Sequence, residues 1–264
     1  MKLATPGVTY MYNRDEKANE KLNISHCHDS YEILFVVEGR GKYIVEGARF
    51  SLRPRTLILI RPFQYHCVEI DADSAYERYV IHFDRSAPIR DVLETLDSIA
   101  DESSNGSGSF YSPEAISQTL CSAFERFKEQ MRVFETDKSI YVRLLLSELI
   151  ILLSSARKEL ISHNDEELGA KVARYINEHI EENISLDEVA HRFFISKYYL
   201  CRLFKKYSGV SVHAYITQKR VLYAKQLIES GQTASGAAYK VGFGDYSAFY
   251  RAYVKQLGRT PTSK

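Results

Sequence analysis

Arginine, lysine and tyrosine residues recur at helical spacing in two short stretches near the C-terminus. In an expected helix over 197–207, the outward positions are Lys197, Tyr198, Cys201, Arg202, Lys205 and Lys206. In a second expected helix over 246–256, they are Tyr246, Ser247, Tyr250, Arg251 and Lys255. An arginine guanidinium can donate two hydrogen bonds to one guanine edge, and a lysine ammonium suits a phosphate. These residue types indicate contacts to nucleic acid.

Each of these helices is expected to be the second helix of a helix-turn-helix motif. In the first motif, the run 185–188 (Ser-Leu-Asp-Glu) is a capping box that starts a short helix. A break at 194–196 follows, and Ser196 is suited to cap the second helix. Gly209 would end that helix as a residue in the left-handed conformation.

Residues 234–258 repeat this plan. Ala190 corresponds to Ala238 at an offset of 48, whereas Arg202 corresponds to Arg251 at an offset of 49, so the second turn is one residue longer. A helix around 214–228 joins the two motifs. Two such motifs in one segment favour DNA binding, with recognition helices that enter the major groove. The alternative is a helical bundle with a solvated basic face.

The charge of the chain is divided between two parts. The whole chain has a net charge of +1, but residues 189–264 hold 13 Lys and Arg against two acids, Glu229 and Asp245. Residues 1–188 hold 22 basic and 32 acidic residues. A basic segment of net charge +11 beside an acidic one of −10 indicates a module that meets a polyanion.

The C-terminal segment resembles the DNA-binding domain of the AraC/XylS family of bacterial transcription regulators. The run 196–209 (SKYYLCRLFKKYSG), Arg220, Ala224 and the run 241–249 (VGFGDYSAF) carry the resemblance. It implies two recognition helices in successive major grooves, about 34 Å apart. By position it implies base contacts from Tyr198, Cys201 and Arg202 in the first motif. In the second motif the implied base readers are Tyr246, Ser247, Tyr250 and Arg251.

The second motif departs from the family pattern in its supporting helix. Ala234 and Ala237 stand where the family usually has branched aliphatic residues, and Val254 replaces an aromatic or basic residue. Smaller side chains should loosen the packing of this helix. We therefore expect the second motif to read DNA more weakly than the first.

The acidic part of the chain has the pattern of short strands. Apolar runs at 31–37, 43–45, 57–60 and 79–83 are separated by Gly and Pro turn signals, which favours a barrel or sandwich. The run 26–32 (HCHDSYE) resembles the first cupin motif and the run 62–66 (PFQYH) the second. If 26–32 is one strand, His26, His28 and Glu32 share a face. Helical periodicity follows over 112–131 and 139–155.

Three interpretations of the barrel residues remain open, besides plain structural histidines. The quartet His26, His28, Glu32 and His66 has the ligand types of a divalent metal site, catalytic or structural. An effector pocket is favoured, because Arg55 replaces the usual glycine before the second cupin motif. Aromatic faces and His or Glu groups would suit a sugar or another small polyol or acid. The expected effector-binding residues are His26, His28, Tyr31, Glu32, Tyr43, Tyr65 and His66, with His82 as a core histidine.

The sequence thus predicts an α+β chain of two domains. A cupin-like β-barrel (about 20–88) with packed helices (about 112–160) would sense an effector and dimerise within residues 1–161. A linker (162–167) would lead to an all-α double helix-turn-helix domain (168–264). We expect a cytoplasmic, homodimeric transcription regulator of promoter DNA, without a cofactor or membrane association, which meets RNA polymerase if it is an activator. The alternatives are a metal-dependent cupin enzyme with a basic appendage and a constitutive dimeric DNA binder.

Overall fold

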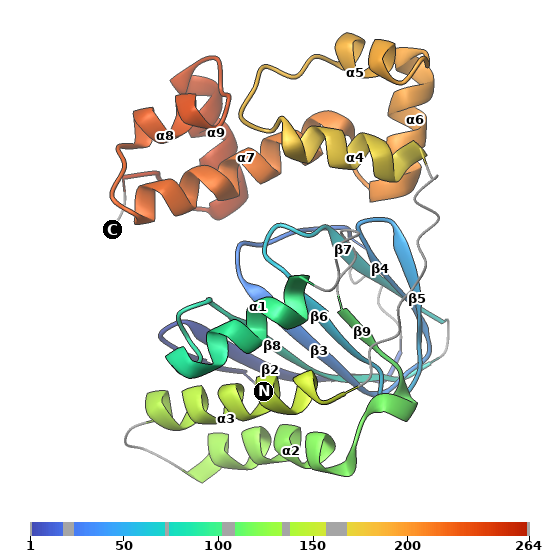
Figure 1. The fold of residues 1–264 in the computed structure, drawn as a ribbon, viewed down its shortest axis with the longest axis vertical. Helices are drawn as coiled ribbons and strands as arrows, with labels where there is room; N and C mark the ends of the chain where they lie inside the picture. The colour runs from blue at the N-terminus through green and yellow to red at the C-terminus, as the bar shows by residue number, and fades with distance from the viewer. Residues whose placement is uncertain are drawn as a thin grey trace. The chain divides into compact units, whose positions relative to one another are not determined.

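The computed structural model of the chain describes residues 2–17, 24–71, 74–101, 109–133, 138–156 and 168–262. Their contacts form two units (Figure 1). The first unit comprises residues 1–24 and 30–163, and the second comprises Ser25–Asp29 and residues 164–264. The expected linker over 162–167 lies outside the described residues.

The first unit is built on two antiparallel sheets. The larger sheet has the order β1 (Lys2–Thr5), β2 (Val8–Asp15), β8 (Tyr76–Phe83), β3 (Tyr31–Glu38), β6 (Leu57–Ile60) and β9 (Ser109–Tyr111). The smaller has the order β5 (Ala48–Leu52), β4 (Gly41–Val45) and β7 (His66–Ile70). Side chains alternate along β3, so that Leu34 and Val36 join a core shared by residues of both sheets.

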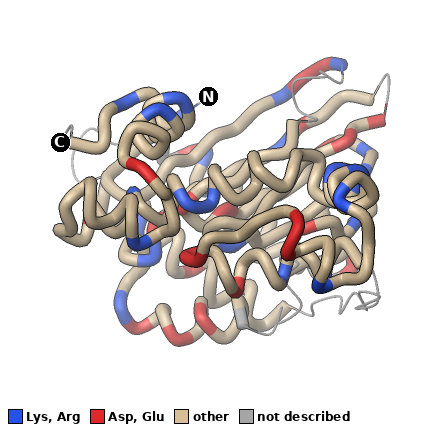
Figure 2. The backbone as a smooth tube through the Cα atoms, turned by 90° about the horizontal axis from the view of Figure 1, so that it is seen from above, with Lys and Arg blue, Asp and Glu red and all other residues tan. Residues whose placement is uncertain are grey.

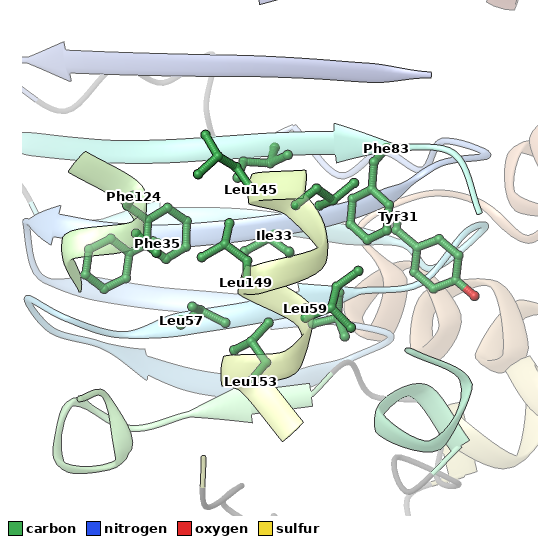
Figure 3. Close-up of a cluster of buried hydrophobic side chains, with 14 of the residues drawn as sticks. Tyr31, Ile33, Phe35, Leu57, Leu59, Phe83, Phe124, Leu145, Leu149 and Leu153 are labelled. Carbon is green, nitrogen blue, oxygen red and sulfur yellow. The ribbon is translucent and has the colours of Figure 1, made fainter. Parts of the chain in front are cut away.

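The opposite face of the larger sheet packs against helices. Ile33 and Phe35, the odd-numbered neighbours on β3, face this second core. Figure 3 shows leucines of α3 (Lys138–Ser154) lying over the strands, and Phe124 of α2 (Gln118–Val133) beside Phe35 at a ring distance of 4.6 Å. The helix α1 (Leu93–Asp101) also contributes to this core. Each fully buried leucine here contributes about 2 kcal/mol to stability.

The structure corrects two expectations about the N-terminal part of the chain. The sheet begins at Lys2, not near residue 20, and Arg14 lies in β2, which pairs with β8 over its whole length. Residues 26–32 do not form one strand, because the chain bends at Asp29 and Ser30 and β3 begins only at Tyr31. The expectation that His26, His28 and Glu32 share one face of a single strand was therefore wrong.

The second unit contains six helices among its described residues. They are α4 (Leu168–Glu178), α5 (Leu186–Arg192), α6 (Lys197–Ser208), α7 (Val212–Glu229), α8 (Ala234–Lys240) and α9 (Tyr246–Leu257). Ser185 and Glu188 form the expected capping box, and Gly209 ends α6 with φ +80°. The long helix α7 joins the pair α5–α6 to the pair α8–α9 (Figure 1). The predicted fold class, a barrel with packed helices followed by a double helix-turn-helix, is confirmed.

Candidate nucleic-acid interface and ligand-binding cluster

The first recognition helix, α6, is held by its buried face. The side chain of Ser196 accepts a hydrogen bond from the Tyr199 amide, which starts the helix. Leu200 and Phe204 are fully buried, and the Phe204 ring meets Tyr215 of α7 edge-on at 5.1 Å. This packing leaves the predicted contact residues of the helix exposed to solvent: Lys197, Tyr198, Cys201, Arg202, Lys205 and Lys206.

The second recognition helix, α9, is built in the same way. The carboxylate of Asp245 accepts a hydrogen bond from the Ala248 amide, and Phe249 and Tyr253 are buried against α7 and α8. Four of the predicted contact residues on α9 are exposed: Ser247, Tyr250, Arg251 and Lys255. Tyr246 is only half-exposed, because its ring packs at 5.7 Å from Phe249. Its side chain is therefore less accessible to a base edge than those of the other three predicted base readers, Ser247, Tyr250 and Arg251.

Arg220 of α7 links the two motifs. Its Nε donates to the Ile180 carbonyl at 2.9 Å, and its Nη1 donates to the Gly242 carbonyl at 2.8 Å. Its Nη2 donates to the Glu182 carbonyl. The loop after α4 leads into the first motif, and Gly242 lies in the turn of the second. The guanidinium of Arg220 therefore holds this loop and this turn together. Partial burial lowers the pKa of Arg220.

Basic residues dominate the C-terminal segment in the structure as they do in the sequence. Figure 2 marks the lysine and arginine positions along the backbone. Exposed lysines at the ends of α6 and α9 suit phosphate contacts, which fix the register of a protein on DNA.

A polar cluster lies in the first unit, beside the core shared by the two sheets. Glu32 and His66 are almost fully buried, and His66 Nε2 lies 3.4 Å from Glu32 Oε2. His82 Nε2 lies 3.7 Å from the same oxygen, because His82 on β8 pairs directly with Glu32 on β3. The Tyr43 hydroxyl donates to Glu32 Oε1 at 3.3 Å. We name these four residues the barrel cluster.

Burial and charge set the protonation of the barrel cluster. Burial lowers the pKa of His66, but the nearby Glu32 carboxylate, with its hydrogen bond, outweighs this effect and raises the pKa above 6.5. Burial, reinforced by Glu32, raises the pKa of Tyr43 well above its ordinary value. The phenol therefore stays neutral and remains a hydrogen-bond donor.

The structure separates Tyr31 from the barrel cluster. Tyr31 lies on the helix-facing side of β3, stacked on Phe83 at 5.2 Å, so its assignment to the barrel pocket was wrong (Figure 3). Tyr65 is buried, and its amide donates to Glu46 at 3.0 Å. His26 and His28 belong to the segment Ser25–Asp29 of the second unit. Of the expected metal quartet, Glu32 and His66 lie in the first unit.

Sequence reasoning undervalued His82. The alternation along β8 was the available signal, because Val80 and His82 share one face while Tyr79 and Ile81 share the other.

A separate surface pocket of about 370 Å³ is lined by Arg40, Gly41, Ser51, Leu52, Arg53, Pro54 and Asp71. None of the predicted effector residues lines this pocket.

Among the described residues, no helix is sufficiently long and apolar to span a bilayer. The comparison with protein families gives two matches. Residues 15–154 match the AraC-like ligand binding domain, and residues 189–263 match a helix-turn-helix domain.

Individual relatives agree with these matches. The HTH-type transcriptional activator RhaS of Enterobacter sp. (strain 638) is 24% identical over 242 residues, which is 89% of this chain and 85% of that protein. RhaS of Salmonella schwarzengrund (strain CVM19633) is 25% identical over 247 residues, with the same coverage. The crystal structure of ToxT from Vibrio cholerae O395 covers 98% of this chain and 96% of its own, with 14% identity and a TM-score of 0.40.

The ligand-binding model matches more than half of the chain, and the helix-turn-helix model matches the segment that carries both recognition helices. The family models and the relatives that match are those of transcription regulators, not enzymes. The chain belongs to the AraC family of ligand-responsive, DNA-binding transcription regulators.

Proposed function

We propose that this regulator responds to a sugar or a related polyhydroxy metabolite bound at the barrel cluster. The observation that supports the proposal is the buried set of one carboxylate, two imidazoles and one phenol beside an apolar core. In this proposal, residues 1–161 sense the effector and residues 168–264 bind DNA. The linker 162–167 connects them.

The chemistry of the barrel cluster favours a neutral effector with several hydroxyl groups. Hydroxyl groups donate to the Glu32 carboxylate and accept from the imidazole N–H groups and the Tyr43 phenol. The Tyr43 ring stacks near His66 at 6.1 Å, so that an aromatic surface lies beside these polar groups. A second carboxylate brought beside Glu32 would add a buried negative charge, which is costly.

Thermal-shift measurements on the full chain test this proposal with a panel of sugars, polyols and organic acids. A ligand that binds only the folded chain at 100 times its Kd stabilises it by about 2.7 kcal/mol. We expect stabilisation by at least one sugar or polyol, and a loss of this response in Glu32→Gln and Tyr43→Phe. If an organic acid alone stabilises the chain, the sugar assignment is wrong, and if no compound of the panel does, the chain is better described as a constitutive dimeric DNA binder.

We propose that α6 and α9 read base edges through Arg202 and Arg251. Tyr198, Cys201, Ser247 and Tyr250 would contact neighbouring bases, as would the half-exposed Tyr246. Lys197, Lys205, Lys206 and Lys255 would bind phosphates. An exposed arginine on a recognition helix suits the guanine O6 and N7 atoms, which supports this assignment. The salt dependence of DNA binding measures the number of phosphate contacts.

We further propose that the protein acts as a homodimer in the cytoplasm, where the chromosome lies, and meets RNA polymerase if it is an activator. Ile140, Leu144 and Ile151 of α3 support a homodimer, because they are at least half exposed and recur on one helix face. An exposed apolar stripe of this kind is typical of a protein interface. Two protomers would then bind repeated half-sites.

A further inference from the structure

The turn of the first helix-turn-helix motif holds a side chain that the fold does not require there. Phe194 is 93% exposed, and its backbone has φ +54°, in the left-handed region that bulky residues avoid. Its neighbour Phe193 packs edge-on against Tyr175 of α4 at 5.9 Å. Phe193 therefore supplies the turn's anchor to the core, and the ring of Phe194 is left in solvent.

The second motif shows what this position needs for folding alone. The Phe194 amide donates to His191 and the Ile195 amide to Ala190, at 3.1 and 3.0 Å. The Gly242 amide donates to Tyr239 and the Phe243 amide to Ala238, both at 3.1 Å. Each pair differs by 48 positions, so Phe194 and Gly242 are structural equivalents. Gly242 adopts φ +86° at no steric cost, as glycine can.

Two unfavourable features thus coincide at Phe194, namely a left-handed backbone and an exposed apolar ring. Strain of this kind persists mainly at functional positions. Phe194 lies two residues before Ser196, the N-cap of α6. The N-terminal end of a recognition helix is the end that meets base edges, and Tyr198, 78% exposed, lies in the first turn of α6.

We propose that Phe194 contacts DNA and selects thymine at the edge of the half-site read by α6. The thymine 5-methyl group is the apolar group that base pairs present in the major groove, and phenylalanine is among the side chains that contact it. The exposed lysines of α6 hold the adjacent phosphates and bring the turn to the groove. Gly242 has no side chain, so the half-site read by α9 lacks this preference.

The inference rests on the proposed DNA contacts of α6. The experiment therefore distinguishes a failure of the role of Phe194 from a failure of those contacts. The probe is the duplex that the full chain selects from a random DNA library. The Asn variant, Phe194→Asn, should weaken binding about five- to tenfold. Its Tm should equal that of the wild type or exceed it by up to about 4 °C, since asparagine tolerates the left-handed region. Phe194→Leu, which keeps an apolar side chain, should lose less than about threefold.

Replacing thymine by uracil in the first half-site removes only the methyl group. We expect this change to weaken wild-type binding about fourfold and to leave the Asn variant unaffected. Equal uracil effects on both proteins would overturn the assignment, as would unchanged affinity of the Asn variant. Unchanged affinity with lost transcription activation would instead assign Phe194 to a protein partner. A wild-type chain that selects no duplex contradicts the proposed DNA contacts themselves, whatever Phe194 does.

Discussion

Arg202 and Arg251 hold equivalent exposed positions on α6 and α9, but the helices that support them differ. The supporting helix of the second motif contributes Ala237 to its core, where the first motif has the larger Val189. Arg202 also lies 5.8 Å from the Tyr199 ring, which orients its guanidinium. The first motif is therefore expected to read DNA more strongly.

We predict that Arg202→Ala weakens specific DNA binding about 10- to 100-fold, and that Arg251→Ala weakens it less. A binding titration of both variants at one salt concentration measures the difference. Lys205→Ala serves as the control, because loss of a phosphate contact should weaken binding to all sequences and reduce the salt slope by about one. A larger loss for Arg251→Ala than for Arg202→Ala contradicts the ranking.

The barrel cluster makes stability depend on pH. The pKa of His66 is raised above 6.5 in the folded chain, so its contribution is fully present below about pH 6.5 and is lost as pH rises through the folded value. We predict a lower Tm at pH 8.5 than at pH 6. His66→Gln should remove much of this difference and cost about 3 kcal/mol at pH 6, since it leaves Glu32 buried without that partner. An unchanged pH profile in the variant would refute this role of His66.

At this scale the sequence predicted exposed residues better than buried ones. Outward positions on α6 followed directly from helical periodicity, because a helix fixes its faces locally. The wrong placement of Tyr31 and the undervalued His82 have a different origin. The face on which a strand residue lies depends on where the strand begins and which strand it pairs with, and the sequence contains no local signal for the bend at Asp29.

At the scale of elements, Arg220 determines whether the two motifs keep a fixed separation. Its guanidinium donates to three backbone carbonyls in two separate loops. We predict that Arg220→Met destabilises the helical unit by about 2–4 kcal/mol, because charged hydrogen bonds are lost and the carbonyls keep no substitute. Thermal unfolding of the full chain measures the effect.

Arg259→Met is the matched control for Arg220→Met. Arg259 pairs with Glu229 at 3.0 Å, but both side chains are about half exposed. Loss of such a surface pair costs less than about 1 kcal/mol. Equal losses in the two variants would mean that Arg220 acts as an ordinary surface charge.

The helical elements were predictable because their ends carry local signals. The capping box at Ser185, the cap at Ser196 and the left-handed Gly209 all lie where the sequence placed them. By contrast, β1 and β2 were missed. The partly polar β2 pairs with β8, which lies more than 60 residues away in the chain, and β1 pairs in turn with β2. Long-range pairing of this kind is not visible in a local pattern.

At the scale of the whole molecule, we predict that substitutions in the α3 stripe abolish a homodimer. Leu144→Lys with Ile151→Lys places two charges at the interface, and light scattering after size-exclusion chromatography should then report a monomer. Ser155→Lys, at an exposed position just after α3, is the control and should leave the dimer intact. A wild-type chain that is itself monomeric, or a dimeric double variant, would show that α3 is not the interface.

The near-neutral charge of the whole chain is the sum of an acidic part, residues 1–188, and a basic part, residues 189–264. In the structure the basic part contains the two recognition helices, which α7 joins. The central claim is that α6 and α9 read two adjacent major-groove segments. Selection of duplexes from a random DNA library by the full chain tests it most directly. We predict two short enriched motifs about one helical turn apart, with only the second lost in Arg251→Ala. Enrichment of a single motif that survives both Arg202→Ala and Arg251→Ala would contradict the claim.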